Sequence, residues 1–113
     1  MKIAFSTYGD SWRDQIDIRF GRAGGFFIVD TDNDEISYID NKENVVSAQG
    51  AGTSAAQIIV DSGAKELITG KVGPKAGEVL KAGAVKVLGG VGYISIKEAY
   101  ELYKQGKLTE QEL

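Results

Sequence analysis

The residues best suited to binding chemistry in this sequence are cationic. All of its arginines lie in one short window: Arg13, Arg19 and Arg22. The planar guanidinium group matches the geometry of oxyanions and can donate two parallel hydrogen bonds to them. A single arginine in a loop usually faces solvent, but three together, with none elsewhere, predict a loop that faces an anion.

A second candidate for anion binding is the glycine-rich turn that follows Leu67 and Ile68. This short apolar pair is bounded by turn residues and predicts a buried strand. Gly70 and Gly73 come next, and Pro74 suits the first position of a helix, where its missing N–H leaves no partner unsatisfied. Main-chain N–H groups and the positive end of a helix dipole meet at such a turn, and both attract anions.

The composition excludes several other functions. The chain has 113 residues with no cysteine and no histidine, which removes disulfides, thiolate metal sites, cysteine nucleophiles and the usual general base. No nucleophile–base pair can be assembled without them, although carboxylate or lysine chemistry stays open, so we predict a binding protein with no catalytic residues and no metal ligands. The net charge of -3 has the wrong sign for a nucleic-acid-binding module. Without a signal peptide or an apolar run of about 20 residues, the protein is expected to be cytoplasmic and to contact no membrane.

The elements that must position these residues begin with three strands. Lys2–Thr7 and residues 26–30 are apolar enough to be buried, and Ile36–Asp40 alternates as a half-buried strand. The last two strands are joined by a tight reversal at residues 32–34 and form a hairpin. The strand at Ile36–Asp40 is therefore expected at the edge of the sheet.

The second half of the chain contains a repeated pattern. Residues 62–70 and 82–90 each combine a helix end, a glycine cap, a strand and a glycine at the carboxyl end of that strand. Such a repeat is typical of consecutive βα units in a parallel sheet. A polar loop over residues 41–52 and a helix from Thr53 or Ser54 are expected before it. A last helix opens at Ser95, and residues 109–113 are expected to form a loose tail.

These elements give the order β-β-β-α-β-α-β-α. We therefore predict one α/β domain over residues 1–113, with a mixed five-stranded sheet and helices on both of its faces. Ligands of open α/β sheets bind at the carboxyl ends of the strands, near the switch in strand order. The glycine turns that end the parallel strands should converge there with the arginine loop.

The predicted binding residues follow from that convergence. Taken alone, each glycine is better explained by a turn or a helix cap, so the prediction depends on their meeting at one edge of the sheet. The residues are Arg19, Phe20, Gly21, Arg22, Thr69, Gly70, Gly73, Gly89 and Gly90.

Four segments, in this order, resemble the dinitrogenase iron–molybdenum cofactor biosynthesis family: DIRFGRA (17–23), FIVD (27–30), ITGKVGPKA (68–76) and GKL (106–108). That family includes nitrogenase accessory proteins of the NifX type and the carboxyl-terminal domain of NifB. The resemblance implies a ribonuclease H-like fold with strand order 3-2-1-4-5. It also implies an iron–sulfur or iron–molybdenum cluster precursor as the bound cofactor.

The sequence departs from this family at one position. Members commonly have a histidine just before the Phe-Gly pair, and here that position is Arg19. Soft clusters prefer thiolate or imidazole ligands, so a cluster held by protein ligands is not expected in this chain. An arginine can still hold an anionic cluster or a small anion through charge-assisted hydrogen bonds.

The sequence is therefore consistent with two functions. The first is a small-ligand-binding domain that takes an anionic metallocofactor precursor or a small anion. The alternative is a non-catalytic protein-interaction module that uses the arginine loop and the Ile36–Asp40 edge strand to hold a partner protein. Trp12, beside the arginines, would serve as a plug packed over the sheet or as part of a ligand lid or partner surface.

Overall fold

The computed structural model of the chain describes residues 1–45 and 50–113. A single turn of 3₁₀ helix, η1 (Phe20–Arg22), lies between the first two strands. The remaining elements are β1 (Lys2–Thr7), β2 (Gly25–Asp30), β3 (Ile36–Asp40), α1 (Lys42–Val45), α2 (Ala51–Asp61), β4 (Ala64–Ile68), α3 (Pro74–Ala82), β5 (Lys86–Gly89), α4 (Ile96–Lys104) and β6 (Thr109–Gln111).

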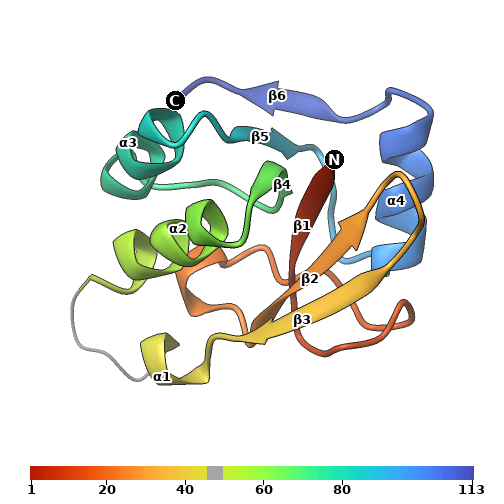
Figure 1. Cartoon of the computed structure of the whole chain (residues 1–113), viewed down its shortest axis with the longest axis horizontal. Coiled ribbons are helices and arrows are strands. Elements are labelled where there is room, and N and C mark those ends of the chain that lie inside the picture. Colours follow the sequence, from red (N-terminus) through yellow and green to blue (C-terminus); the bar gives the residue numbers. More distant parts are fainter. Residues whose placement is uncertain (46–49) are drawn as a thin grey trace.

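The strands form one mixed sheet in the order β3-β2-β1-β4-β5-β6 (Figure 1). β1, β2 and β3 pair antiparallel, β4 and β5 join β1 in parallel, and β6 returns antiparallel to β5. The predicted order 3-2-1-4-5 and the edge position of β3 are confirmed. The predicted count of five strands is wrong, because Thr109–Gln111, expected in a loose tail, pairs with the open edge of β5. The ribonuclease H-like classification stays a prediction.

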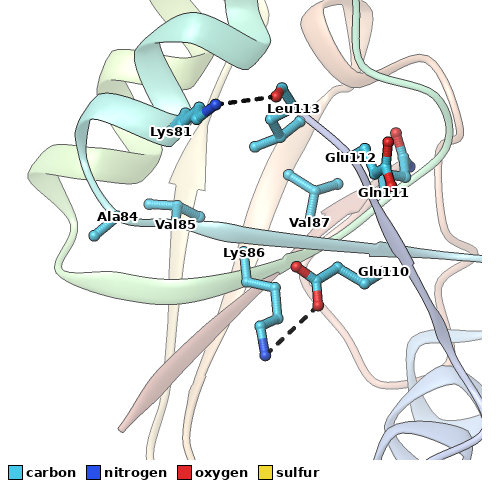
Figure 2. A pocket seen from close by; sticks show the side chains of 9 residues that line it. All are labelled: Lys81, Ala84, Val85, Lys86, Val87, Glu110, Gln111, Glu112 and Leu113. Atoms are coloured by element: carbon cyan, nitrogen blue, oxygen red, sulfur yellow. Dashed lines mark hydrogen bonds and ion pairs between the residues drawn. The ribbon is translucent and has the colours of Figure 1, made fainter.

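Side chains attach β6 to its neighbours in addition to the strand pairing. Gln111 Nε2 donates a 2.7 Å hydrogen bond to the carbonyl oxygen of Gly70, and its Oε1 accepts a 3.3 Å bond from the N–H of Val72. Figure 2 shows a second contact made by the preceding residue of β6, Glu110, whose Oε1 lies 3.8 Å from Lys86 Nζ. An exposed ion pair contributes little stability. The amide of Gln111, which ties β6 to the turn after β4, is therefore the more important attachment.

Two hydrophobic cores lie on the two faces of the sheet. α2 and α3 cover one face, and α4 covers the other together with the loop that follows β1 (Figure 1). Neighbouring residues of β1 point to opposite faces: Ala4 packs in the core under α2 and α3, whereas Ile3 and Phe5 pack in the core under α4. The expectation of helices on both faces is confirmed.

The core under α4 is largely aromatic. The ring centroid of Trp12 lies 4.9 Å from that of Phe27 in an edge-to-face arrangement and 5.3 Å from that of Tyr100. Phe5 lies 6.5 Å from Phe27 and 6.2 Å from Tyr100, again edge to face. Trp12 therefore packs over the sheet, as the plug interpretation predicts, while its side chain stays partly exposed.

The helices begin largely where expected. α3 starts at its proline, and α4 starts with a complete capping box. α2 begins at Ala51 and not at Thr53 or Ser54, since Gly50, with a φ of 77°, turns the chain into the helix earlier. The predicted 41–52 loop is wrong at α1 (Lys42–Val45) and at the first two residues of α2, which are helical, and its residues 46–49 lie outside the described residues. None of the helices in the described ranges is long and apolar enough to cross a membrane.

Tyr103 on α4 should make the fold sensitive to alkaline pH. Burial, followed by a 2.7 Å hydrogen bond donated to Glu66 Oε1 on β4, raises the pKa of Tyr103 above its usual value. As the pH rises, the Tyr103 phenol would therefore lose its proton in the unfolded chain before it does so in the folded protein. The free energy of unfolding should therefore be retained below the ordinary tyrosine pKa of about 10 and fall as the pH rises beyond it.

Tyr103→Phe should flatten this alkaline fall in stability. The measurement is urea denaturation at a series of pH values from about 8 to 11, which brackets the ordinary tyrosine pKa. Tyr93→Phe is the matched control, because Tyr93 is 69% exposed. Identical pH slopes for the wild-type and Tyr103→Phe proteins would contradict the role assigned to this phenol.

Candidate functional site

The loop after β1 crosses the carboxyl end of β4. A Cβ atom built on Gly70 would overlap the carbonyl oxygen of Ile18 and would lie 2.7 Å from Ile18 Cβ. Glycine at position 70 is therefore needed for the close approach of two backbones, in addition to any role in the turn. This crossing lies beside the switch in strand order, between β1 and β4, where a ligand site is expected.

A hollow of about 800 Å³, here called the edge cleft, opens at this end of the sheet. Its lining comes from four separate parts of the chain: Ile18, Arg19, Gly70, Lys71, Gly89, Gly90, Val91, Thr109, Gln111 and Glu112. Four of the predicted binding residues thus meet here, namely Arg19, Gly70, Gly89 and Gly90. They are distant in the sequence and are brought together by the sheet topology, because they lie at or after the ends of three strands of one sheet, β1, β4 and β5.

Arg19 is held in place by a buried acid. Asp17 Oδ1 accepts 3.0 Å hydrogen bonds from both the main-chain N–H and Nε of Arg19, and Asp17 Oδ2 lies 2.9 Å from Arg19 Nη2. The Asp17 side chain is fully buried, whereas that of Arg19 is 59% exposed. The bonds and the charge of Asp17 raise the pKa of Arg19 above its usual value, so the guanidinium is charged at every relevant pH. It also lies 5.6 Å from the centroid of the Tyr8 ring.

Thr69, another predicted binding residue, lies behind the cleft. Its side chain is fully buried, and its Oγ1 lies 2.6 Å from Ser6 Oγ. Ser6 Oγ is also 2.6 Å from the carbonyl oxygen of Asp17. The single Ser6 proton must go to that carbonyl, which can only accept, so the Thr69 hydroxyl donates to Ser6. Thr69 therefore helps to hold the backbone of Asp17 and, through it, Arg19.

A neighbouring pocket of about 430 Å³, here called the helix-end pocket, lies where α2 and α3 begin. Phe20, Gly21 and Gly73, also predicted, line this pocket and not the edge cleft. Neither helix has a side-chain cap or an acidic residue in its first turn. Lys71 and Lys75 add positive charge there, and Lys71 lines both pockets.

The last predicted residue, Arg22, is not brought to this place. It is exposed at the end of η1 and is not among the residues that line either the edge cleft or the helix-end pocket. The arginine loop therefore contributes one guanidinium to the edge cleft and not two.

Six lining residues of the edge cleft are not among the predicted binding residues, and three of these six have long polar or charged side chains, namely Lys71, Gln111 and Glu112. Lys71 lies inside the predicted glycine turn, so its charge could have been included from its position alone. Gln111 and Glu112 come from the segment expected to be a tail, and no pattern in the sequence marks them. Asp17 lies behind the cleft lining and is also not among the predicted residues, although it is the fully buried partner of Arg19.

The donor set of the edge cleft fits binding through charge and hydrogen bonds. The chain contains no cysteine or histidine, and the described residues include no cluster of three or more acidic side chains able to hold a metal ion. The charged lining residues are Arg19, Lys71 and Glu112. The main-chain N–H groups of Lys71 and Gly90 donate no hydrogen bond within the described ranges, so they can serve a ligand.

The chain is similar in sequence and in fold to several known proteins. A sequence profile of the family described as dinitrogenase iron-molybdenum cofactor matches residues 1–106. An uncharacterized protein of Methanocaldococcus jannaschii is 35% identical over 95 residues, which cover 82% of this chain and 80% of that protein. The apo form of the orange protein of Desulfovibrio gigas has a TM-score of 0.93 and 35% identity, over 97% of this chain and 92% of that one. A candidate NifB protein of Thermotoga gives a TM-score of 0.84 and 31% identity, over 96% and 91% of the two chains.

Proposed function

Because this chain belongs to the dinitrogenase iron–molybdenum cofactor family, we propose that it binds an anionic metal–sulfur cluster precursor as cargo in the edge cleft. The binding unit is a single domain over residues 1–113, and it acts as a carrier with no catalytic step. The similarity to the orange protein, whose structure is that of an apo form, supports a role in carrying a bound group.

The observation that carries this proposal is the attachment of Arg19 to Asp17. Two guanidinium nitrogens, Nε and Nη2, are bonded to the buried carboxylate, and the side chain of Arg19 remains 59% exposed. The guanidinium is therefore oriented before any ligand arrives and still has donors to offer. Such preorganisation lowers the cost of ordering a side chain on binding.

Charge and hydrogen bonds replace metal–ligand bonds in this proposal. Sulfide groups on the surface of an anionic cluster would accept hydrogen bonds from Arg19, from Lys71 and from the main-chain N–H groups at Lys71 and Gly90. Gly89 and Gly90 add no side chain that would keep a large ligand away from the backbone. Asp17 is paired with Arg19 and Glu112 also lines the cleft, so these two carboxylates balance the charges of Arg19 and Lys71. Binding would therefore depend on where the individual donors of Arg19 and Lys71 lie, and not on a net positive charge.

Tetrathiomolybdate is a suitable probe, because it is a coloured dianion with sulfide at its surface. We expect the wild-type protein to retain it through anaerobic gel filtration, as measured by absorbance and molybdenum analysis. Lys71→Gln should weaken binding about tenfold, equivalent to about 1.4 kcal/mol and close to the value of one hydrogen bond to a charged group. Arg19→Gln combined with Asp17→Asn should abolish retention without leaving a buried carboxylate unpaired.

Lys107→Gln is the matched control, since it removes the same charge from an exposed lysine that lines neither pocket. Thermal unfolding of each variant would separate lost binding from lost folding. Absence of retained metal in the wild-type protein, both with this probe and after reconstitution with iron and sulfide, would overturn the carrier function. Equal retention by the Lys71 and Lys107 variants would overturn the assignment of the site to the edge cleft.

A further inference from the structure

A third hollow, on the face of the sheet covered by α4, shares no lining residue with the edge cleft or the helix-end pocket. This α4 groove has a volume of about 470 Å³, and its aromatic walls are Trp12 and Tyr100. Charged side chains surround these rings, among them Arg13 and Lys97. Tryptophan, tyrosine and arginine are the residue types that most often dominate binding at protein interfaces.

The two aromatic walls are held rigidly from below. Trp12 packs against Phe27 and Tyr100 at centroid distances of 4.9 and 5.3 Å. Tyr100 is only 8% exposed, stacks on Tyr103 at 6.2 Å, and donates a 3.0 Å hydrogen bond to Asp34 Oδ1. Rings that are already ordered lose little freedom when a partner side chain packs against them.

The charges around the groove are not evenly matched. Lys104 Nζ lies 3.1 Å from Glu101 Oε1 and 4.7 Å from the centroid of the Tyr100 ring. The second carboxylate that lines the groove, that of Asp34, accepts a hydrogen bond from the Tyr100 hydroxyl. Arg13 and Lys97 are exposed and form no ion pair with any side chain in the described part of the chain. Arg13 and Lys97 are therefore two positively charged side chains, without an ion pair in the described residues, beside an aromatic groove in a protein whose net charge is -3.

We propose that the α4 groove docks an acidic segment of a partner protein that presents an aromatic side chain. The aromatic ring packs on the exposed surface of Trp12 beside the edge of Tyr100, since these two rings already touch at 5.3 Å, and flanking carboxylates pair with Arg13 and Lys97. Complementary charge steers such a segment to the groove and rejects a basic one. The edge cleft stays open while the partner is docked, since the two hollows are lined by different residues. The interaction surface expected from the sequence is the arginine loop with the Ile36–Asp40 edge strand; this proposal keeps Trp12 and Arg13 and joins them to residues of α4 in place of the edge strand.

Trp12 allows a direct test, because it is the only tryptophan in the chain. The probe is the peptide EEFEE, capped at both ends and titrated to millimolar concentration into the intact protein. We expect a saturable change in Trp12 emission and shifts of the indole N–H signal in NMR spectra. Arg13→Gln and Lys97→Gln should each weaken binding about threefold or more, and added salt should weaken it further. Lys107→Gln, which changes an exposed lysine outside the groove, should bind the peptide as the wild-type protein does.

Several outcomes would overturn the proposal. One is that the charge-inverted peptide KKFKK, or the leucine peptide EELEE, binds as tightly as EEFEE. Equal binding by all three glutamine variants would remove the role of Arg13 and Lys97. If benzoate alone saturates the groove as tightly as the peptide, the site is for a small molecule and not for a protein segment. If Trp12 emission changes with protein concentration while light scattering reports a dimer, the occupant is a second copy of this chain.

Discussion

Replacing Phe27 with alanine should lower the free energy of unfolding by about 3–5 kcal/mol, the range for a buried aromatic side chain. Phe27 on β2 is fully buried, and its ring supports both Trp12 and Phe5. The cavity would open in the middle of the aromatic core, between the rings of Phe5 and Trp12. Urea denaturation followed by circular dichroism gives the change in stability. Emission of the folded variant should also shift to longer wavelength as Trp12 loses its support.

Ile28→Val is the matched control on the same strand. Ile28 points to the opposite core, under α2 and α3, and loses only one methylene group. Its expected cost is about 0.5–1.5 kcal/mol, with no change in Trp12 emission. A Phe27→Ala protein within about 1 kcal/mol of the wild type would contradict the importance given to the aromatic core.

Replacing Gly70 with alanine should both destabilise the fold and weaken ligand binding. The new Cβ atom would overlap the carbonyl oxygen of Ile18, so the loop after β1 must move away from β4. Overpacking of this kind costs about 1–3 kcal/mol. Arg19 follows Ile18 directly, so its guanidinium would leave its position at the edge cleft. Urea denaturation and tetrathiomolybdate retention measure the two effects.

Gly92→Ala is the control for this change, because nothing lies within 4 Å of a Cβ atom at Gly92. It should stay within about 0.5 kcal/mol of the wild type and keep the ligand. If Gly70→Ala were as stable as Gly92→Ala, the close approach of the two loops would not be a constraint on the fold. If it were unstable yet bound the probe normally, the position of Arg19 would not matter for binding.

Most of the fold could be predicted because its signals are local. The glycine-capped repeat at residues 62–70 and 82–90 predicts two parallel strands, and Pro74 marks a helix start that the structure confirms. β6 could not be predicted in the same way. Its three residues, Thr109–Gln111, have no apolar alternation, and they form a strand only because β5 offers an unpaired edge. That is a tertiary effect, invisible in the segment itself.

The candidate site shows the same division. Arg19 and the glycine turns could be selected because the sheet topology forces loops after neighbouring strands together. The role proposed for Asp17 could not, since an acid in a polar loop is usually solvated and nothing nearby in the sequence marks it as fully buried. The sequence alone does not distinguish between the two roles given to Trp12, a plug packed over the sheet and a part of a ligand lid or partner surface. In the structure its ring packs on the core and also forms a wall of the α4 groove.

The lining of the edge cleft extends along the chain from Ile18 to Glu112. During synthesis on a ribosome, β1 to β5 can emerge and pair before Gln111 reaches the turn at Gly70. Contacts between residues so distant in the chain form late, since they need most of the sheet in place. The cleft therefore lacks one wall until residues 109–111 have joined β5, and the proposed ligand could be held there only after that pairing.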